Sequence, residues 1–490
     1  VAFGQGTIVL SNRWRYRLSF EARCSRPATE IQLYLGGDPE YRQGNALLEG
    51  TATLGTDPDT FQLSGYSTTN SADAYLAFGL GATEADYYFS DIRLEMVPDE
   101  GRDKYKQPFA RESIWNKPIG SEAEYAQCDF GPSQAAAIDA DYWIVGKDSD
   151  PERILYDIPS SLWLYRRCND RWIDTGVHLP FPDSVVVRDV IREPYPQTPN
   201  NSTACLKPDG RTIIQWNAIC RETWGGDVWG VPHRDRNGVL FPDEDIYGLG
   251  IKGCHGGSGL SSIGGTIRCG ELVSPEPIRH ALKVDIDDAY MYGGPGSFRW
   301  PAWKSDGNWD LGGVDTLYSG TNPQLCMGSL LAIPLADSSR KHELETPVAK
   351  KLFDALMGYG AYVVDNAAWD CYYFCAENGV REEAEAYFGH SIDTMQNTPY
   401  HRDVNRLFGW LHVVANNDSL HVGGGGDPIA EWVDELVQEG HSDSTGQTTQ
   451  PRLMIGDRSP TAISFTVDMP EICQGHLRVY DVGGRLVAEV

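Results

Sequence analysis

The fold class that this sequence predicts is all-β with few helices, arranged as tandem β-sandwich or jelly-roll domains. Three observations lead to it. Residues 1–98 alternate apolar and polar side chains with almost no helical period. Residues 109–441 are again mostly strand-like, with Gly-rich turns between the strands. The length of 490 residues exceeds what one hydrophobic core covers, since domains usually span ~100–200 residues.

The front segment, residues 1–98, is expected to form a β-sandwich. Short strands are predicted at 16–23, 31–35, 74–80 and 86–96, with turns of Gly, Asp and Pro between them. A charged stretch follows directly, and we expect a linker there, at residues 99–108.

The largest segment, residues 109–441, is predicted to be a second β-sandwich domain. Its clearest helix is expected at 346–358, because Thr346 can cap it and an apolar face follows. The pattern at residues 407–414 predicts a short helix or a strand. The pattern at residues 427–439 predicts an amphipathic helix.

The end of the chain resembles the start of a further domain. Residues 442–451 are polar and are predicted to be a second linker. Within 452–490, alternation predicts strands at 462–467 and 475–490, the start of an Ig-like fold. These few strands cannot close a hydrophobic core. We therefore expect the natural protein to continue beyond this piece.

Composition excludes several classes of protein. Lys and Arg number 41 against 69 Asp and Glu, a formal net charge of -28, which argues against nucleic acid and anionic membranes as partners. No apolar run approaches the ~18 residues of a membrane span, so we expect a soluble protein. The 11 Cys show no zinc-site spacing, and Cys371 and Cys375 would lie too far apart on a strand to pair.

The front segment resembles the jelly-roll carbohydrate-binding modules that accompany cellulases and xylanases. The resemblance lies in Trp14-Arg-Tyr-Arg-Leu-Ser-Phe-Glu-Ala-Arg and in Tyr87-Tyr-Phe-Ser-Asp-Ile-Arg-Leu. It implies that aromatic rings bind sugar faces, with Tyr34 and Tyr41 as candidates. Half-buried sandwich packing is the alternative for each ring.

Two further resemblances concern export. Leu477-Arg-Val-Tyr-Asp-Val-Gly-Gly-Arg-Leu-Val resembles the sorting domains of type IX secretion and the Ig-like domain of hook-capping proteins. Ser113-Ile-Trp-Asn-Lys-Pro-Ile-Gly is similar to uncharacterised secreted proteins of bacteria and fungi. Together they imply a bacterial protein that is extracellular or bound to the cell surface.

The densest group of ionisable residues is predicted within 253–287. A Gly-rich loop with His255 leads into a predicted strand at 262–272, which carries Arg268 and Glu271. His280 lies on the next strand. Glu271 shares a strand face with apolar neighbours, so its pKa should be raised, as a general acid requires. Alternatively, Glu271 ends the strand and contacts water.

A second group of candidates follows at 359–377, where Asp365 and Glu377 end apolar strands beside aromatic residues, as in a sugar cleft. The aromatic and basic residues around both groups are candidates for substrate binding. They are Trp115, Trp300, Trp303, Arg268 and Arg299.

These residues predict a secreted glycoside hydrolase acting on β-glucan or xylan through two carboxyl groups. Glu271 would be the acid and Asp365 the base or nucleophile, in one cleft with His255 or His280. No cofactor and no metal ligand are assigned, although a structural Ca²⁺ on loop carboxylates stays open. The alternatives are a polysaccharide lyase, with Arg268 or Arg299 neutralising a uronate and a His as base, or a non-catalytic polysaccharide-binding protein.

Overall fold

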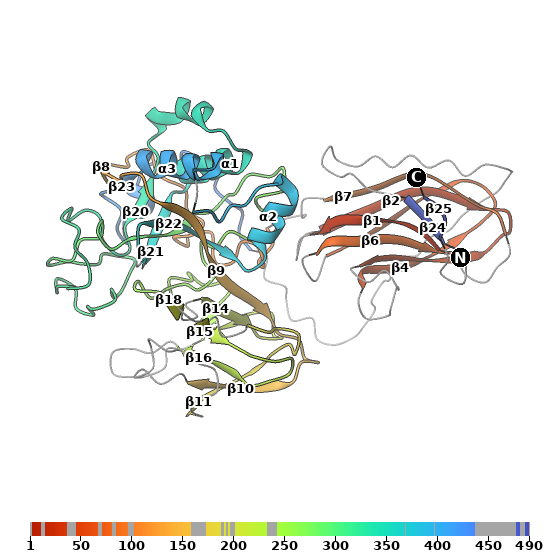
Figure 1. The fold of residues 1–490 in the computed structure, drawn as a ribbon, viewed down its shortest axis with the longest axis horizontal. Helices are drawn as coiled ribbons and strands as arrows, with labels where there is room; N and C mark the ends of the chain where they lie inside the picture. Colours follow the sequence, from red (N-terminus) through yellow and green to blue (C-terminus); the bar gives the residue numbers. More distant parts are fainter. Residues whose placement is uncertain are drawn as a thin grey trace. The chain divides into compact units, whose positions relative to one another are not determined.

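The computed structural model describes most of the chain, which is largely β-strand with few helices, as predicted (Figure 1). It divides into two compact units, residues 1–100 with 382–390 and 439–490, and residues 101–381 with 391–438. The described residues are 2–10, 15–36, 46–66, 71–80, 85–96, 102–157, 173–187, 191–192, 195–196, 201–232, 243–367, 369–395, 397–436, 477–480 and 486–489.

The first unit is a β-sandwich. One sheet has the strand order β25-β24-β1-β6-β3-β4 and the other β5-β2-β7. Phe20 lies between them, with its ring centroid 5.0 Å from that of Phe61 and 5.1 Å from that of Phe78. The strands are β1 (Ala2–Leu10), β2 (Arg15–Cys24), β3 (Thr29–Gly36), β4 (Ala46–Leu54), β5 (Asp59–Tyr66), β6 (Ser71–Gly79), β7 (Tyr87–Met96), β24 (Leu477–Tyr480) and β25 (Leu486–Glu489).

The two described C-terminal strands belong to this first sheet. β24 pairs antiparallel with β1, with Ala2 opposite Tyr480 and Gln5 opposite Leu477, and β25 pairs with β24. Most of the segment predicted as a separate domain lies outside the described residues, so that domain stays a prediction.

The second unit is built on a continuous mixed sheet of thirteen strands, in the order β11-β10-β16-β15-β14-β9-β22-β19-β21-β20-β23-β8, with β17 paired to β15. β12 (Ile191–Arg192) and β13 (Tyr195–Pro196) form a separate pair. The strands are β8 (Tyr125–Gln127), β9 (Ala135–Val145), β10 (Glu152–Asp157), β11 (Ile173–Pro180), β14 (Ser202–Leu206), β15 (Thr212–Cys220), β16 (Val228–Pro232), β17 (Glu244–Asp245), β19 (Leu282–Asp287), β20 (Leu330–Ala332), β21 (Ala361–Ala367), β22 (Cys371–Glu377) and β23 (His412–Val414).

Helices cover part of this sheet (Figure 1). The predicted helix at 346–358 is confirmed as α1 (Pro347–Gly358), where the Thr346 side chain accepts a hydrogen bond from the backbone N–H of Ala349. The remaining helices are α2 (Val380–Phe388), which the sequence did not predict, α3 (Pro399–Trp410), and the 3₁₀ segments η2 (Leu335–Glu343) and η3 (Val422–Gly424).

Two predicted elements are wrong. Within 427–436 the chain is not helical, because Ile429 donates its backbone N–H to Ile119 and Pro428 bridges to Gly120, which holds this stretch extended. Residues 262–272 form turns instead of a strand. Gly265 and Gly270 adopt φ values of 73° and 88°, and this left-handed backbone interrupts an extended chain.

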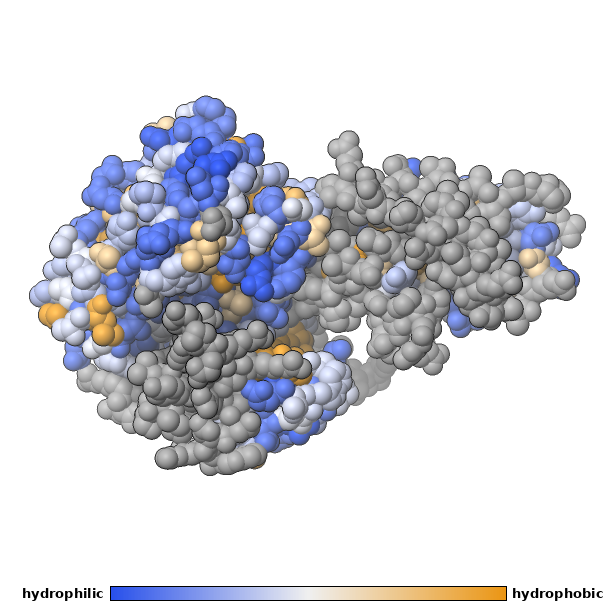
Figure 2. Space-filling view, in the orientation of Figure 1, coloured by the Kyte–Doolittle hydropathy of each residue, from blue (hydrophilic) through white to orange (hydrophobic). Residues whose placement is uncertain are grey.

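The predicted linker at 102–108 packs onto the second unit. The indole of Trp143 donates to the carbonyl of Tyr105, and the Gln107 amide donates to the carbonyl of Arg279. Cys220 is in a disulfide, whereas Cys371 and Cys375 are both free thiols. The coloured surface in Figure 2 is predominantly hydrophilic, with small separate hydrophobic areas. Among the described residues, no helix is long and apolar enough for a membrane span.

Candidate active site

Four neighbouring strands of the second unit present ionisable side chains on one face. Asp139 on β9 lies opposite Cys375 on β22, and Asp285 on β19 lies opposite Asp365 on β21. β22 and β19 are joined by the pair Tyr373 and Asp285, and Tyr373 is two residues from Cys375 and therefore on its face. The strands β9-β22-β19-β21 thus carry a continuous row of four such side chains.

His255 reaches this row from β18 (Lys252–His255) and the glycine turn after it. The N–H of Ser258 donates to the carbonyl of Val364, which fixes the turn against β21. Gly256 has a φ of 41°, and a Cβ at this position would lie 2.0 Å from Cγ of Asp365. Only glycine therefore allows this close approach of the turn to the carboxyl group.

A buried ion pair lies beside the row. Nζ of Lys283 is 2.7 Å from Oδ2 of Asp141, and both side chains are fully buried. Nε2 of His255 lies 3.1 Å from Oδ1 of Asp141 and 3.5 Å from Oδ2 of Asp139. Burial raises the pKa of Asp141, but Lys283 and His255 outweigh it and lower the pKa overall. Burial and the charge of Lys283 lower the pKa of His255.

Two carboxyl groups of the row hold protons more tightly than usual. Burial raises the pKa of Asp139 well above its ordinary value, and the charge of Asp141 adds to it. Burial and the charge of Asp139 raise the pKa of Asp285 in the same way. The side chain of Asp139 retains 21% exposure, whereas the Asp285 residue retains only 4%. Solvent therefore contacts the row at Asp139.

Asp365 lies at the other end of the row and is 6% exposed. The backbone N–H of Gly257 donates to its Oδ1 at 2.8 Å. The ammonium group of Lys304 donates to the carbonyls of Gly256 and Gly257 at 2.8 and 2.9 Å, and so holds the turn in place. Burial, followed by the charge of Asp306, raises the pKa of Asp365 to about 7.

Asp306 is an exposed carboxylate on the opposite side of the same turn. A Cβ added to Gly257 would lie 2.5 Å from its Oδ2, so Asp306 and Asp365 flank one peptide unit. The hydroxyl of Tyr318 donates to Oδ2 of Asp306. An aromatic pair adjoins it, in which Trp303 and Trp309 meet edge to face with centroids 5.2 Å apart.

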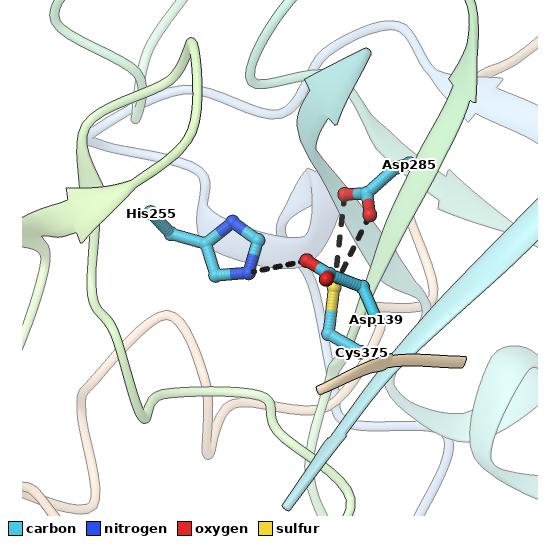
Figure 3. A group of neighbouring side chains, drawn as sticks. All are labelled: Asp139, His255, Asp285 and Cys375. Atoms are coloured by element: carbon cyan, nitrogen blue, oxygen red, sulfur yellow. Dashed lines mark hydrogen bonds and ion pairs between the residues drawn. The ribbon is translucent and has the colours of Figure 1, made fainter. Parts of the chain in front are cut away.

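One group in this site has the arrangement of metal ligands. Donor atoms of Asp139, His255, Asp285 and Cys375 all lie within 4.8 Å of one another, and the side chains converge in Figure 3. Sγ of Cys375 lies 3.7 and 3.9 Å from the two carboxyl oxygens of Asp285.

The predicted acid, Glu271, belongs to a different group. Its carboxyl oxygens lie 3.1 and 3.2 Å from Nε2 of His280, and one accepts the N–H of Arg268 at 2.6 Å. Burial raises the pKa of Glu271, but the pairing with His280 outweighs it, so the pKa is lowered overall. The predicted raised pKa is therefore wrong, and His280 is an ion-pair partner here. The contacts of Glu271 are those of a structural carboxylate.

Several predicted substrate-binding residues are instead buried or bonded within the protein. Trp115 is 1% exposed, and its indole donates to the carbonyl of Gly250. Arg268 is 1% exposed and donates to the carbonyls of Ile263 and Lys106. Arg299 donates to the carbonyl of Ala415.

The remaining predicted residues divide between the core and the surface of the site. Trp300 packs against the main core of the second unit, and Glu377 is buried and accepts the N–H of Cys269. Trp303 lies in the aromatic pair beside Asp306. In the first unit, Tyr34 is 7% exposed and so presents little ring to a sugar, whereas Tyr41 lies outside the described residues.

Of the four strands around the site, the sequence predicted three, which are β22, β19 and β21. These three are neighbours in the sheet in that order. It missed Asp139, Asp141, Cys375 and Asp306 as site residues. A signal was present for the first two: carboxyl groups two apart in the otherwise apolar strand Ala135–Val145 must share one face. Asp306 carried no comparable signal, since it lies in an irregular loop.

A cavity of about 530 Å³ lies elsewhere in the second unit, over β15. Some of its ionisable lining groups form surface ion pairs, Lys207 with Asp243 at 2.8 Å and His178 with Glu152 at 3.1 Å. Burial raises the pKa of another, Glu244. Ion pairs that are exposed to water are weak, because the solvent screens their charges. The buried row, where like charges are held together, is the stronger candidate for catalysis.

No family model matches this chain, and no curated protein matches it significantly. Six chains of solved structures do match. One, described as "CBM4 structure and function", is 23% identical over 19% of this chain and 59% of its own, with a TM-score of 0.17. Another, "BiXyn10A CBM1 APO", is 15% identical over 17% of this chain and 55% of its own, with a TM-score of 0.14. This chain thus spans less than two thirds of either structure.

Proposed function

We propose that the chain is a polysaccharide-degrading enzyme, a glycoside hydrolase acting on β-glucan or xylan, whose site is the turn between Asp365 and Asp306. The observation that carries the proposal is that one buried and one exposed carboxyl group flank the single peptide unit of Gly257. Hydrolysis of a glycosidic bond needs two such groups in unlike environments, one protonated and one ionised.

The environments suit two different roles. Asp365, with its pKa raised to about 7, is protonated in slightly acidic solution and in part at neutral pH, and it donates this proton to the glycosidic oxygen as the bond breaks. Asp306 is the base that activates water, or the nucleophile, and Tyr318 orients it through a hydrogen bond. The proton leaves with the departing sugar, and water supplies the new anomeric hydroxyl group.

The aromatic residues near Asp306 favour a sugar over a smaller substrate. Trp309 is 38% exposed and packs on Trp303, whose indole donates to the carbonyl of Gly259 at 2.6 Å. Nζ of Lys304 lies 5.6 Å from the Trp309 ring centroid. A partly exposed indole that packs against a second, hydrogen-bonded indole is a platform on which a sugar ring can stack.

The lyase alternative has weaker support. A lyase needs a cation to neutralise a uronate, and both arginines considered for that role, Arg268 and Arg299, donate to backbone carbonyls. His280 is paired with Glu271. These contacts occupy both arginines and His280, one of the two histidines considered as the base; the other is His255.

Incubation of the full chain with a panel of neutral and uronate polysaccharides tests the proposal. We expect new reducing ends from β-glucan or xylan without the ultraviolet absorbance of an unsaturated uronate. Reducing ends together with that absorbance would establish a lyase instead. Retention on a polysaccharide gel without any product would establish a binding protein.

A further inference from the structure

Donor atoms of four side chains converge from the strands β9, β18, β19 and β22 at the Asp139 end of the row. They are Oδ of Asp139 and Asp285, Nε2 of His255 and Sγ of Cys375, all within 4.8 Å (Figure 3). They supply one nitrogen, one sulfur and two oxygens. Imidazole, thiolate and carboxylate are the three kinds of ligand that Zn²⁺ takes from proteins.

The spacing of these atoms fits a tetrahedral ion. Zinc bonds of ~2.0–2.3 Å place neighbouring ligand atoms ~3.3–3.8 Å apart. Nε2 of His255 lies 3.5 Å from Oδ2 of Asp139, and Sγ of Cys375 lies 3.7 Å from Oδ1 of Asp285. Two opposite edges of the tetrahedron therefore already have the required length.

His255 gives a second, independent indication. The residue is 1% exposed, and among the described residues neither ring nitrogen makes a hydrogen bond of normal geometry. Nε2 points into the group (Figure 3), and its near neighbours there are carboxyl oxygens of Asp141 at 3.1 Å and Asp139 at 3.5 Å. A buried imidazole without hydrogen bonds is costly unless it binds something. A metal ion at the centre of the group would take up the lone pair of Nε2.

The charge of the group also favours a cation. Lys283, the nearest cation, is already paired with Asp141 at 2.7 Å, so this pair is neutral. Asp139, Asp285 and Cys375 can together supply three negative charges to a dication. Buried ionisable groups of this kind are normally paired or coordinate a metal.

We propose that Asp139, His255, Asp285 and Cys375 bind one zinc ion. The site goes beyond the proposed hydrolysis, and neither Asp365 nor Asp306 is among the four ligands.

Direct metal binding tests this proposal, and enzyme activity is not part of the readout. The full chain is dialysed against a chelator and titrated with ZnCl₂ by calorimetry, and Co²⁺ is then used as an absorbing substitute. We expect one Zn²⁺ per chain and, with Co²⁺, a thiolate-to-metal charge-transfer band. Cys375→Ser should abolish the band and weaken Zn²⁺ binding at least ~10-fold, because it removes a ligand.

Cys326→Ser is the matched control, since Cys326 is an equally buried free thiol outside the group. It should keep both the band and the affinity, and far-ultraviolet circular dichroism checks the fold of each variant. Wild-type protein that binds no Zn²⁺, or a Co²⁺ band that survives Cys375→Ser, would overturn the proposal whatever the stability of the variants.

Discussion

Asp285 and Asp365 lie opposite each other in register on the parallel strands β19 and β21. Adjacent strands are ~4.8 Å apart, so two buried carboxyl groups share one face at close range. Burial is the larger cause of the raised pKa of Asp285, and the charges of Asp139 and Asp365 add to it. The sheet thus builds a proton-holding site by burying carboxyl groups in register on one face.

Replacement of Asp365 tests the proposed acid. Asp365→Asn keeps the size of the side chain but removes the transferable proton, so kcat/KM on the best polysaccharide should fall ~10²–10⁴-fold. Asp354→Asn is the matched control, because Asp354 lies on α1 with 42% of its side chain exposed and forms a surface ion pair with Lys341. Equal losses in both variants, or a loss below ~10-fold for Asp365→Asn, would remove Asp365 from the mechanism.

Replacement of buried and of exposed tryptophans should affect different properties of the protein. Trp115→Ala should lower the free energy of unfolding by ~3–5 kcal/mol, because the ring is fully buried. Trp309→Ala should cost less than ~1 kcal/mol yet raise KM, because this partly exposed indole is the proposed sugar platform. Trp224→Ala is the control: the residue is 71% exposed, and its replacement should change neither the free energy of unfolding nor KM. Denaturant melts and initial rates measure the two effects, and an unchanged KM for Trp309→Ala would contradict the platform.

The fold was predictable where a pattern is local. Alternation located β2, β3, β6 and β7, and the cap at Thr346 located α1. The strand predicted at residues 262–272 was wrong, because Gly265 and Gly270 adopt a left-handed backbone that composition alone does not reveal.

The site was less predictable, because it depends on pairing between distant strands. Asp139 and Cys375 meet across more than two hundred residues of sequence through the β9–β22 register. The error on Glu271 has a different cause, since its partner His280, nine residues away along the chain, reversed the effect of burial on its pKa. Side-chain partners of this kind are fixed by tertiary packing rather than by neighbours in the chain.

Acid stability should depend on Glu345. Its hydrogen bonds and ion pairs with Arg402 and Arg406 lower the pKa of this exposed carboxyl to about 2. A lowered pKa stabilises the fold above the unfolded value of ~4.3, and this stabilisation is lost as the pH falls through about 2. As the pH falls between these two values, the melting temperature of Glu345→Gln should therefore fall less than that of the wild type, because the variant has already lost the ion pairs with Arg402 and Arg406. An exposed neighbour, Glu343→Gln, should follow the wild type.

Binding to polysaccharide should persist when catalysis is disabled. The Asp365→Asn variant of the whole chain should migrate more slowly in affinity gels that contain β-glucan or xylan, since the sequence of the front sandwich resembles carbohydrate-binding modules. Adding Trp309→Ala shows how much of the retardation comes from the second unit. Migration that no glucan or xylan changes would contradict a binding role for the first unit.

The most direct test of the central claim is the origin of the oxygen at the cleaved bond. Digestion in H₂¹⁸O followed by mass spectrometry of the released oligosaccharides should show one ¹⁸O atom at each new reducing end, because hydrolysis adds water at the anomeric carbon. Products that lack ¹⁸O and carry an unsaturated sugar would identify β-elimination, and the absence of any product from β-glucan and xylan would contradict a hydrolase that acts on them.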